Sequence, residues 1–145
     1  MKKLMLVIPL LLLVAFAAVA EFRLPAGVYR MDELGDARNR AARMNKPIAF
    51  LLSDESSSCP VTDKISLEAV KKFRLRTVVV YAHSKNDWNG LPDTVRTAFR
   101  SSEAGKYIPK IVVIDPDFQE VLAIIPCVPD DRDRAKLFRE KLRSF

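Results

Sequence analysis

The segments Ile48–Leu52 (IAFLL) and Ser53–Pro60 (SDESSSCP), which follow each other directly, decide the fold of this chain. A short, continuous apolar run of this kind is typical of a strand that is buried on both faces. Proline is favoured in the first turn of a helix, so Pro60 marks the start of one. The sequence therefore predicts a strand, a short polar loop and a helix, with the single thiol of Cys59 at the helix start. The free N–H groups and the positive dipole end at such a position lower the pKa of a thiol.

Outward from this segment, hydrophobic periodicity predicts alternating helices and strands. The helices are expected over Asp32–Met44, Pro60–Phe73 and Pro92–Phe99 and from about Asp131, and the strands over Ile48–Leu52, Leu75–Ala82, Ile111–Ile114 and Val121–Ile125. The last two strands flank the turn Asp115–Phe118 and so form a hairpin. The economical packing of this order is an α/β fold, with a central mixed β-sheet flanked by helices on both faces.

The first twenty residues have the three regions of a secretory signal peptide. They comprise Lys2 and Lys3, an apolar run over Leu4–Ala17, and the small residues Ala18–Ala20. A membrane anchor is the alternative, but the run is short for a bilayer span of about 20 residues. We therefore expect cleavage after about Ala20, a periplasmic or secreted protein, and no membrane association after cleavage.

The remaining chain has the size of one domain, which we place at 32–145 after an N-terminal extension over 21–31. The formal charge of the whole chain is +6, and cleavage removes two lysines and leaves +4. The basic residues are interleaved with acidic ones and no basic stripe with aromatic residues occurs, so we expect no nucleic-acid partner.

Three local features together resemble the thioredoxin-like superfamily. They are Asn45–Phe50 leading into Ser56–Cys59, the stretch Tyr107–Asp115 (YIPKIVVID), and Cys127 shortly after the second hairpin strand. The resemblance covers roughly Asp32–Phe145. It implies a thioredoxin-like fold, with Ser56–Cys59 at the position of the family's Cys-x-x-Cys motif.

The departures from the family pattern limit the chemistry that the resemblance implies. Ser56 replaces the first cysteine of the motif, and a serine hydroxyl cannot form a disulfide. The tryptophan that usually precedes that cysteine is here Glu55, whose negative charge disfavours a nearby thiolate. An ordinary dithiol reductase is therefore not expected. We expect instead a degenerate Ser-x-x-Cys site that performs thiol-disulfide or monothiol chemistry on proteins.

Within this resemblance each candidate residue has an expected role. Cys59 attacks as a thiolate, Ser56 and the helix N–H groups stabilise it, and Cys127 resolves the intermediate. Ile108 and Pro109 match the family's cis-proline segment, which binds an extended substrate peptide by strand addition. The resemblance also implies partial burial of Cys59. A disulfide between Cys59 and Cys127 is compatible with the sequence but not decided by it, because two cysteines in an oxidising compartment often pair.

Two other functions remain open. The first is a non-catalytic peptide- or protein-binding module that uses the same groove. The second is a thiol peroxidase, because Ser56–Cys59 resembles the Thr/Ser-x-x-Cys part of the peroxiredoxin signature, although Leu52 occupies the position of its upstream proline. In either case the expected partner is a protein or peptide of the cell envelope, and the sequence does not indicate an oligomeric state.

Neither a metal nor a cofactor is expected. His83 is the only histidine, and it has no ligand spacing with Cys59 or Cys127 that suits a metal site. The few glycines are not clustered, so the chain has no glycine-rich phosphate loop.

Overall fold

The computed structural model describes residues 23–57 and 59–145. The expected signal peptide over 1–20 and Ser58 lie outside the described residues. The elements are, in chain order, β1 (Tyr29–Arg30), the 3₁₀ helix η1 (Met31–Glu33), α1 (Leu34–Met44), β2 (Ile48–Ser53), α2 (Pro60–Phe73), β3 (Val78–His83), the 3₁₀ helix η2 (Trp88–Gly90), α3 (Asp93–Arg100), β4 (Lys110–Ile114), β5 (Val121–Ile125) and α4 (Asp131–Leu142).

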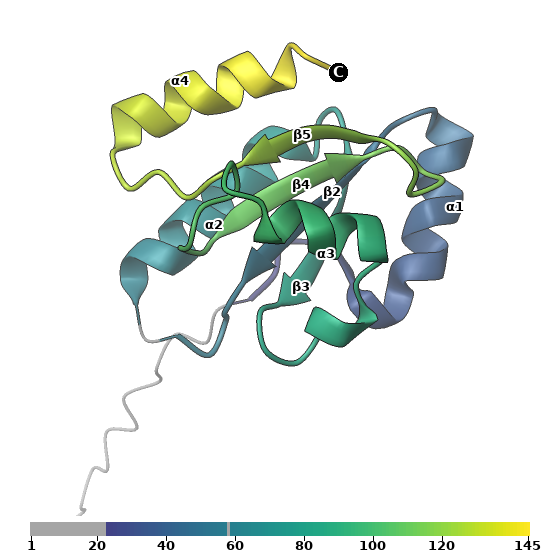
Figure 1. The fold of residues 1–145 in the computed structure, drawn as a ribbon, viewed down its shortest axis with the longest axis horizontal. Helices are drawn as coiled ribbons and strands as arrows, with labels where there is room; N and C mark the ends of the chain where they lie inside the picture. The colour runs from purple at the N-terminus through teal and green to yellow at the C-terminus, as the bar shows by residue number, and fades with distance from the viewer. Residues whose placement is uncertain (1–22, 58) are drawn as a thin grey trace, which may run out of the picture.

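The described strands form one mixed sheet in the order β1-β3-β2-β4-β5 (Figure 1). Strands β1, β3 and β2 run parallel, whereas β4 is antiparallel to β2 and β5 is antiparallel to β4. A sheet of this order, with helices on both faces, is the thioredoxin-like fold. The predicted fold class is confirmed.

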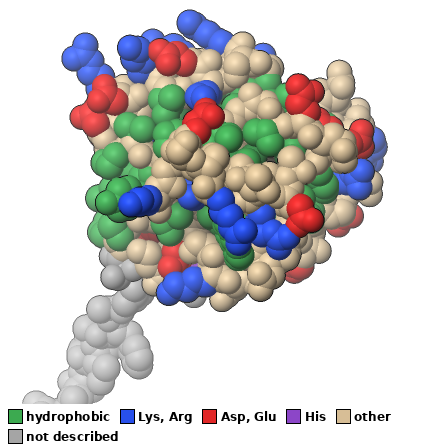
Figure 2. All heavy atoms as spheres, in the orientation of Figure 1, with side chains coloured by type: hydrophobic (Ala, Val, Ile, Leu, Met, Phe, Trp, Pro, Cys, Tyr) green, Lys and Arg blue, Asp and Glu red, His purple; other side chains and the backbone are tan. Residues whose placement is uncertain are grey.

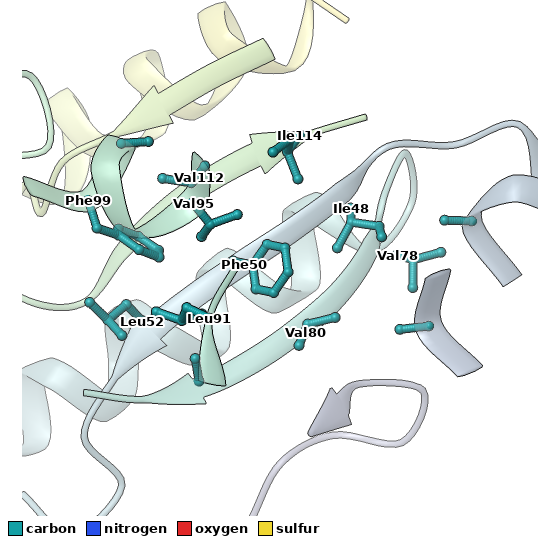
Figure 3. Close-up of a cluster of buried hydrophobic side chains, with 14 residues drawn as sticks. Ile48, Phe50, Leu52, Val78, Val80, Leu91, Val95, Phe99, Val112 and Ile114 are labelled. Atoms are coloured by element: carbon teal, nitrogen blue, oxygen red, sulfur yellow. The ribbon is translucent and has the colours of Figure 1, made fainter. Parts of the chain in front are cut away.

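Alternate residues of each strand supply the two hydrophobic cores. In β2, Ile48, Phe50 and Leu52 face the core under α1 and α3, where the side chains of β3 and β4 join them (Figure 3). Ala49 and Leu51 face the other core, which α2 and α4 cover. Each of these β2 side chains is at most 3% exposed, which explains why β2 is a continuous apolar run. Burial of one such Leu, Ile or Phe side chain contributes about 1.5–3 kcal/mol.

The hairpin strands lie where the sequence predicted them, but the start of β3 differs. Leu75 was expected in this strand, yet it is 71% exposed and β3 begins at Val78. The reason is the turn that ends α2: the backbone N–H and the hydroxyl of Thr77 both donate to the carbonyl of Phe73 at 2.9 Å. These two bonds keep the chain turned until Val78. The two-residue strand β1 and the two 3₁₀ helices were not expected, because segments this short carry no periodicity.

On the face seen in Figure 2, Lys and Arg side chains are interspersed with acidic and uncharged ones. The described part of the chain contains no helix that combines the length and the apolar character needed to cross a bilayer.

Candidate functional site

The start of α2 lies at the end of the sheet where β2 and β5 finish (Figure 1), and the predicted site residues belong to segments at this end. The loop after Ser53 leads to Cys59 and the start of α2. Because Leu52 pairs with Lys110, Pro109 lies beside the end of β2. Because Ile111 pairs with Ile125, the residues that follow β5, including Cys127, lie at this same end. The topology thus brings Cys59, Pro109 and Cys127 to the same end of the sheet, which we call the cysteine end.

Cys59 is the N-cap residue of α2, and its thiol is exposed. The expectation of partial burial was therefore wrong: Cys59 starts the helix at the end of an outward loop, where the sheet does not cover it. The neutral thiol makes no capping hydrogen bond. The backbone N–H and hydroxyl of Thr62 and the N–H of Val61 favour the thiolate and lower the pKa of Cys59, while the Asp63 carboxylate opposes them.

Ser56 is bound to Asp54 and not to the thiol. Both the backbone N–H and the hydroxyl of Ser56 donate to Asp54 Oδ1, at 2.9 and 2.5 Å. These hydrogen bonds, with the nearby His83, hold the pKa of the Asp54 carboxyl below its usual range, although burial acts against them. A hydroxyl has one proton to donate, so in this arrangement Ser56 holds the loop rather than the sulfur.

His83 anchors the same loop from β3. Its Nε2 lies 3.1 Å from Asp54 Oδ1, and its Nδ1 accepts from the backbone N–H groups of Lys85 and Asn86. Since Nδ1 accepts hydrogen bonds, the ring proton lies on Nε2 and is donated to Asp54. Asp54 was not among the site residues expected from the sequence. The pairing of Ser53 with His83 in the sheet explains why the two meet, but no spacing in the sequence shows it.

Glu55 is held by a second set of contacts on the other side of the loop. Arg30 of β1 donates to both Glu55 carboxylate oxygens, at 3.1 and 3.2 Å. The Glu55 backbone N–H donates to the hydroxyl of Tyr81, at 2.8 Å. Burial raises the pKa of Tyr81. The negative charge expected to disfavour the Cys59 thiolate is therefore paired with a guanidinium.

A cleft of about 670 Å³ adjoins the loop on this side. Its lining residues are Arg23, Leu24, Pro25, Val28, Arg30, Glu33, Glu55 and Ser56.

The Ile108–Pro109 peptide bond is cis. Pro109 is buried and Ile108 is half-buried, while Tyr107 is 77% exposed. The next residue, Lys110, turns inward and donates from Nζ to the carbonyls of Phe99 and Gly105, both at 2.9 Å. Burial lowers the pKa of Lys110. These two bonds fix the segment before β4 against the end of α3, and so hold Pro109 at the cysteine end of the sheet.

Cys127 is half-buried in the segment that joins β5 to α4, and both cysteines are free thiols in the structure. Burial raises the pKa of the Cys127 thiol, while the charge of Arg134 acts in the opposite direction. The two thiols therefore differ: Cys59 is exposed with a lowered pKa, and Cys127 is sheltered with a raised one.

Among the described residues, no three or more His, Cys, Asp or Glu side chains group in a way that could hold a metal ion. His83, the candidate singled out in the sequence, is engaged by Asp54 and by the turn after β3.

Comparisons with known proteins give only distant likenesses, and these are to solved structures. No protein-family model and no curated protein matches the chain. A solved structure described as "DsbH Oxidoreductase" aligns with a TM-score of 0.47 and 16% identity, over 75% of this chain and 81% of its own. A likeness this distant does not indicate an activity, so any function must be inferred from the site itself.

Proposed function

We propose that this protein is a periplasmic or secreted thioredoxin-like protein that performs thiol-disulfide exchange on protein substrates through Cys59. The observation that carries the proposal is the exposed Cys59 thiol at the start of α2, whose pKa is lowered by Thr62 and Val61. A thiolate is the nucleophile in disulfide exchange, and a lowered pKa increases its fraction at neutral pH.

The first step joins the protein to its substrate. The Cys59 thiolate attacks one sulfur of a substrate disulfide and forms a mixed disulfide. The other substrate sulfur leaves as a thiolate and takes up a proton from solvent. The N–H groups at the start of α2 stabilise the negative charge on Cys59 before the attack.

In the second step Cys127 loses its proton and attacks the sulfur of Cys59. A Cys59–Cys127 disulfide forms, and the second substrate sulfur leaves as a thiolate. The substrate disulfide has then been reduced to two thiols and the two thiols of the protein have been oxidised. A protein dithiol is the class of reductant that would return the protein to its starting state. No cofactor takes part.

Ile108 and Pro109 are proposed to bind the substrate chain beside Cys59. Pro109 has no N–H, and it lies directly before β4, next to the end of β2. An extended peptide could pair with the backbone of Ile108 by strand addition. Asp54, His83 and Arg30 hold the loop that presents Cys59, and Ser56 contributes to this through its bonds to Asp54.

The test is to trap the mixed disulfide. The Cys127→Ser protein is incubated with a peptide that contains one disulfide, and the products are measured by mass spectrometry without reduction. We expect an adduct on Cys59. It should form faster than the adduct of the same disulfide peptide with a reference thiol, a short unstructured peptide that contains one cysteine. The matched control is Cys59→Ser, which keeps Cys127 as the only thiol and is expected to react slowly. If the Cys127→Ser protein reacts no faster than the unstructured peptide, the proposal is wrong.

The alternative functions give different results in the same set of proteins. A non-catalytic binding module predicts that Cys59→Ser binds its protein partner with unchanged affinity. A thiol peroxidase predicts rapid conversion of Cys59 to sulfenic acid by dilute peroxide.

The proposed compartment and partner also need a test. We propose that the signal peptide is removed after about Ala20, that the protein then acts on proteins or peptides of the cell envelope, and that it associates with neither a membrane nor nucleic acid. Mass measurement of the protein from the periplasmic fraction checks the first point, because a mature chain would begin near Glu21.

A further inference from the structure

Arg134 of α4 is a buried charged residue that reacts in neither step of the proposed exchange. Its side chain is 1% exposed. It makes five hydrogen bonds at 2.6–2.9 Å to oxygen acceptors. A buried guanidinium is costly unless it is paired and hydrogen-bonded, so its acceptors show what it holds in place.

Two of these acceptors belong to the segment that carries Cys127. Arg134 Nη1 donates to the carbonyls of Val128 and Pro129, each at 2.9 Å. Pro126 and Pro129 have no N–H, so this segment has few backbone donors with which to fix itself. Arg134 supplies the missing donors directly after Cys127.

Another acceptor belongs to α2, the helix that begins at Cys59. Arg134 Nε and Nη2 both donate to Glu68 Oε2, at 2.9 and 2.6 Å. Arg134 thus joins the helix that presents one thiol to the segment that presents the other. Asp131 accepts the remaining bond but is two-thirds exposed, so Glu68 is the more sheltered counter-charge.

Arg134 also lies near the cysteine end of the sheet. A small void there is lined by Arg134 together with Pro109, Pro126 and Ile65. The guanidinium is near enough to Cys127 for its positive charge to favour the thiolate form of that residue.

We propose that Arg134 is a positioning residue for the resolving step: it holds the Cys127 segment against α2 and places a guanidinium at the carbonyl of the next residue, Val128, with Glu68 setting how much of that positive charge Cys127 experiences. This inference rests on the proposed function for its catalytic meaning, but the geometry and charge can be tested without it.

The test measures Cys127 alone, in the Cys59→Ser protein. The rate of alkylation by iodoacetamide is recorded against pH, and the midpoint gives the pKa of Cys127. Arg134→Gln removes the positive charge, so we expect the pKa to rise and the rate near neutral pH to fall by about three- to tenfold. Glu68→Gln removes a negative charge that pairs with Arg134, so we expect the pKa of Cys127 to fall and the alkylation rate near neutral pH to rise. The matched control, Arg132→Gln, removes one exposed positive charge from the same helix and is expected to leave the profile unchanged.

A merely structural role for Arg134 would not give shifts of opposite sign in the Arg134 and Glu68 variants. Identical profiles for the Cys59→Ser protein and its Glu68→Gln variant would overturn the proposal, even if Arg134→Gln failed to fold. Arg134→Lys keeps the positive charge but loses the planar arrangement of donors. We therefore expect the pKa of Cys127 to stay close to its value in the Cys59→Ser protein, and the segment after Cys127 to be bound less firmly.

A second measurement separates this proposal from the proposed function. In the protein with both cysteines, the equilibrium constant for forming the Cys59–Cys127 disulfide is measured against glutathione. We expect Arg134→Lys to lower it. If no such disulfide forms in the unmutated protein, the resolving step fails, whereas the alkylation profiles still decide whether Arg134 acts on Cys127.

Discussion

Replacement of Ser66 by alanine is predicted to destabilise the protein through a single buried hydrogen bond. The Oγ atoms of Ser53 and Ser66 lie 2.8 Å apart, and the two residues are 2% and 1% exposed. Ser53 is the last residue of β2 and Ser66 lies in α2, so the bond joins the two elements that flank the Cys59 loop. Without Ser66 the hydroxyl of Ser53 is left buried and without this partner, which costs about 1–3 kcal/mol.

The assay is urea unfolding followed by far-UV circular dichroism. For a domain of this size the dependence of the unfolding free energy on urea is about 1–3 kcal/mol per molar. A loss of about 2 kcal/mol therefore lowers the midpoint by about 1 M. The matched control is Ser102→Ala, at an exposed position, with an expected change within about 0.5 kcal/mol.

The double variant provides the decisive comparison. Ser53→Ala/Ser66→Ala removes both hydroxyls and leaves no orphaned group, so it should cost clearly less than the sum of the two single variants. If the losses in unfolding free energy of the two single variants add up to that of the double variant within about 0.5 kcal/mol, the two hydroxyls are not coupled and the reasoning is refuted.

Three further predictions concern the thiol, the loop and the core. Thr62→Val removes a hydroxyl that favours the Cys59 thiolate, so the pKa of Cys59 should rise. The pKa is measured from the pH profile of alkylation. An unchanged midpoint would mean that the backbone N–H groups alone lower the pKa of Cys59. The pKa of Asp54 is lower in the folded protein than the 3.8 of an unperturbed carboxyl, so its contribution to stability is present above pH 3.8 and is lost as the pH falls through the folded value. Urea midpoints between about pH 2 and about pH 5 should therefore fall less steeply for Asp54→Asn than for the unmutated protein, and equal slopes would contradict this. Phe138→Ala removes a ring packed edge-on against Phe73 at a centroid distance of 5.2 Å. The free energy of unfolding should fall by about 3–5 kcal/mol in the same assay. A loss below about 1 kcal/mol would show that the core closes around the gap.

The fold could be predicted from the sequence because its cores depend on continuous runs and regular spacing. Ile48–Leu52 is apolar throughout because both of its faces are covered, and Pro60 marks the start of α2. The strand β1 could not be predicted, because two residues show no pattern. Leu75 was misassigned to a strand because its apolar character says nothing of the turn that leaves it exposed.

The site could be predicted only in part. The order of the elements predicts that Cys59 starts a helix. It also predicts that Cys127 and Pro109 lie at the same end of the sheet. The contacts that hold the site do not, because each joins residues that are distant in the sequence. His83 meets Asp54 only because β3 pairs with β2, and Arg134 meets Glu68 only because two helices cover the same face. Such pairs have no signature in a single sequence.

The Arg30–Glu55 ion pair has a mechanical consequence. Arg30 belongs to the outermost strand of the sheet, which is two residues long, and Glu55 belongs to the loop that carries Cys59. A pull on the chain ahead of β1 would reach the Cys59 loop through the Arg30 guanidinium and also through β3, whose Tyr81 pairs with Arg30 in the sheet and accepts from the Glu55 backbone N–H. A stretching force applied at the N-terminal side should therefore change the rate at which Cys59 is alkylated.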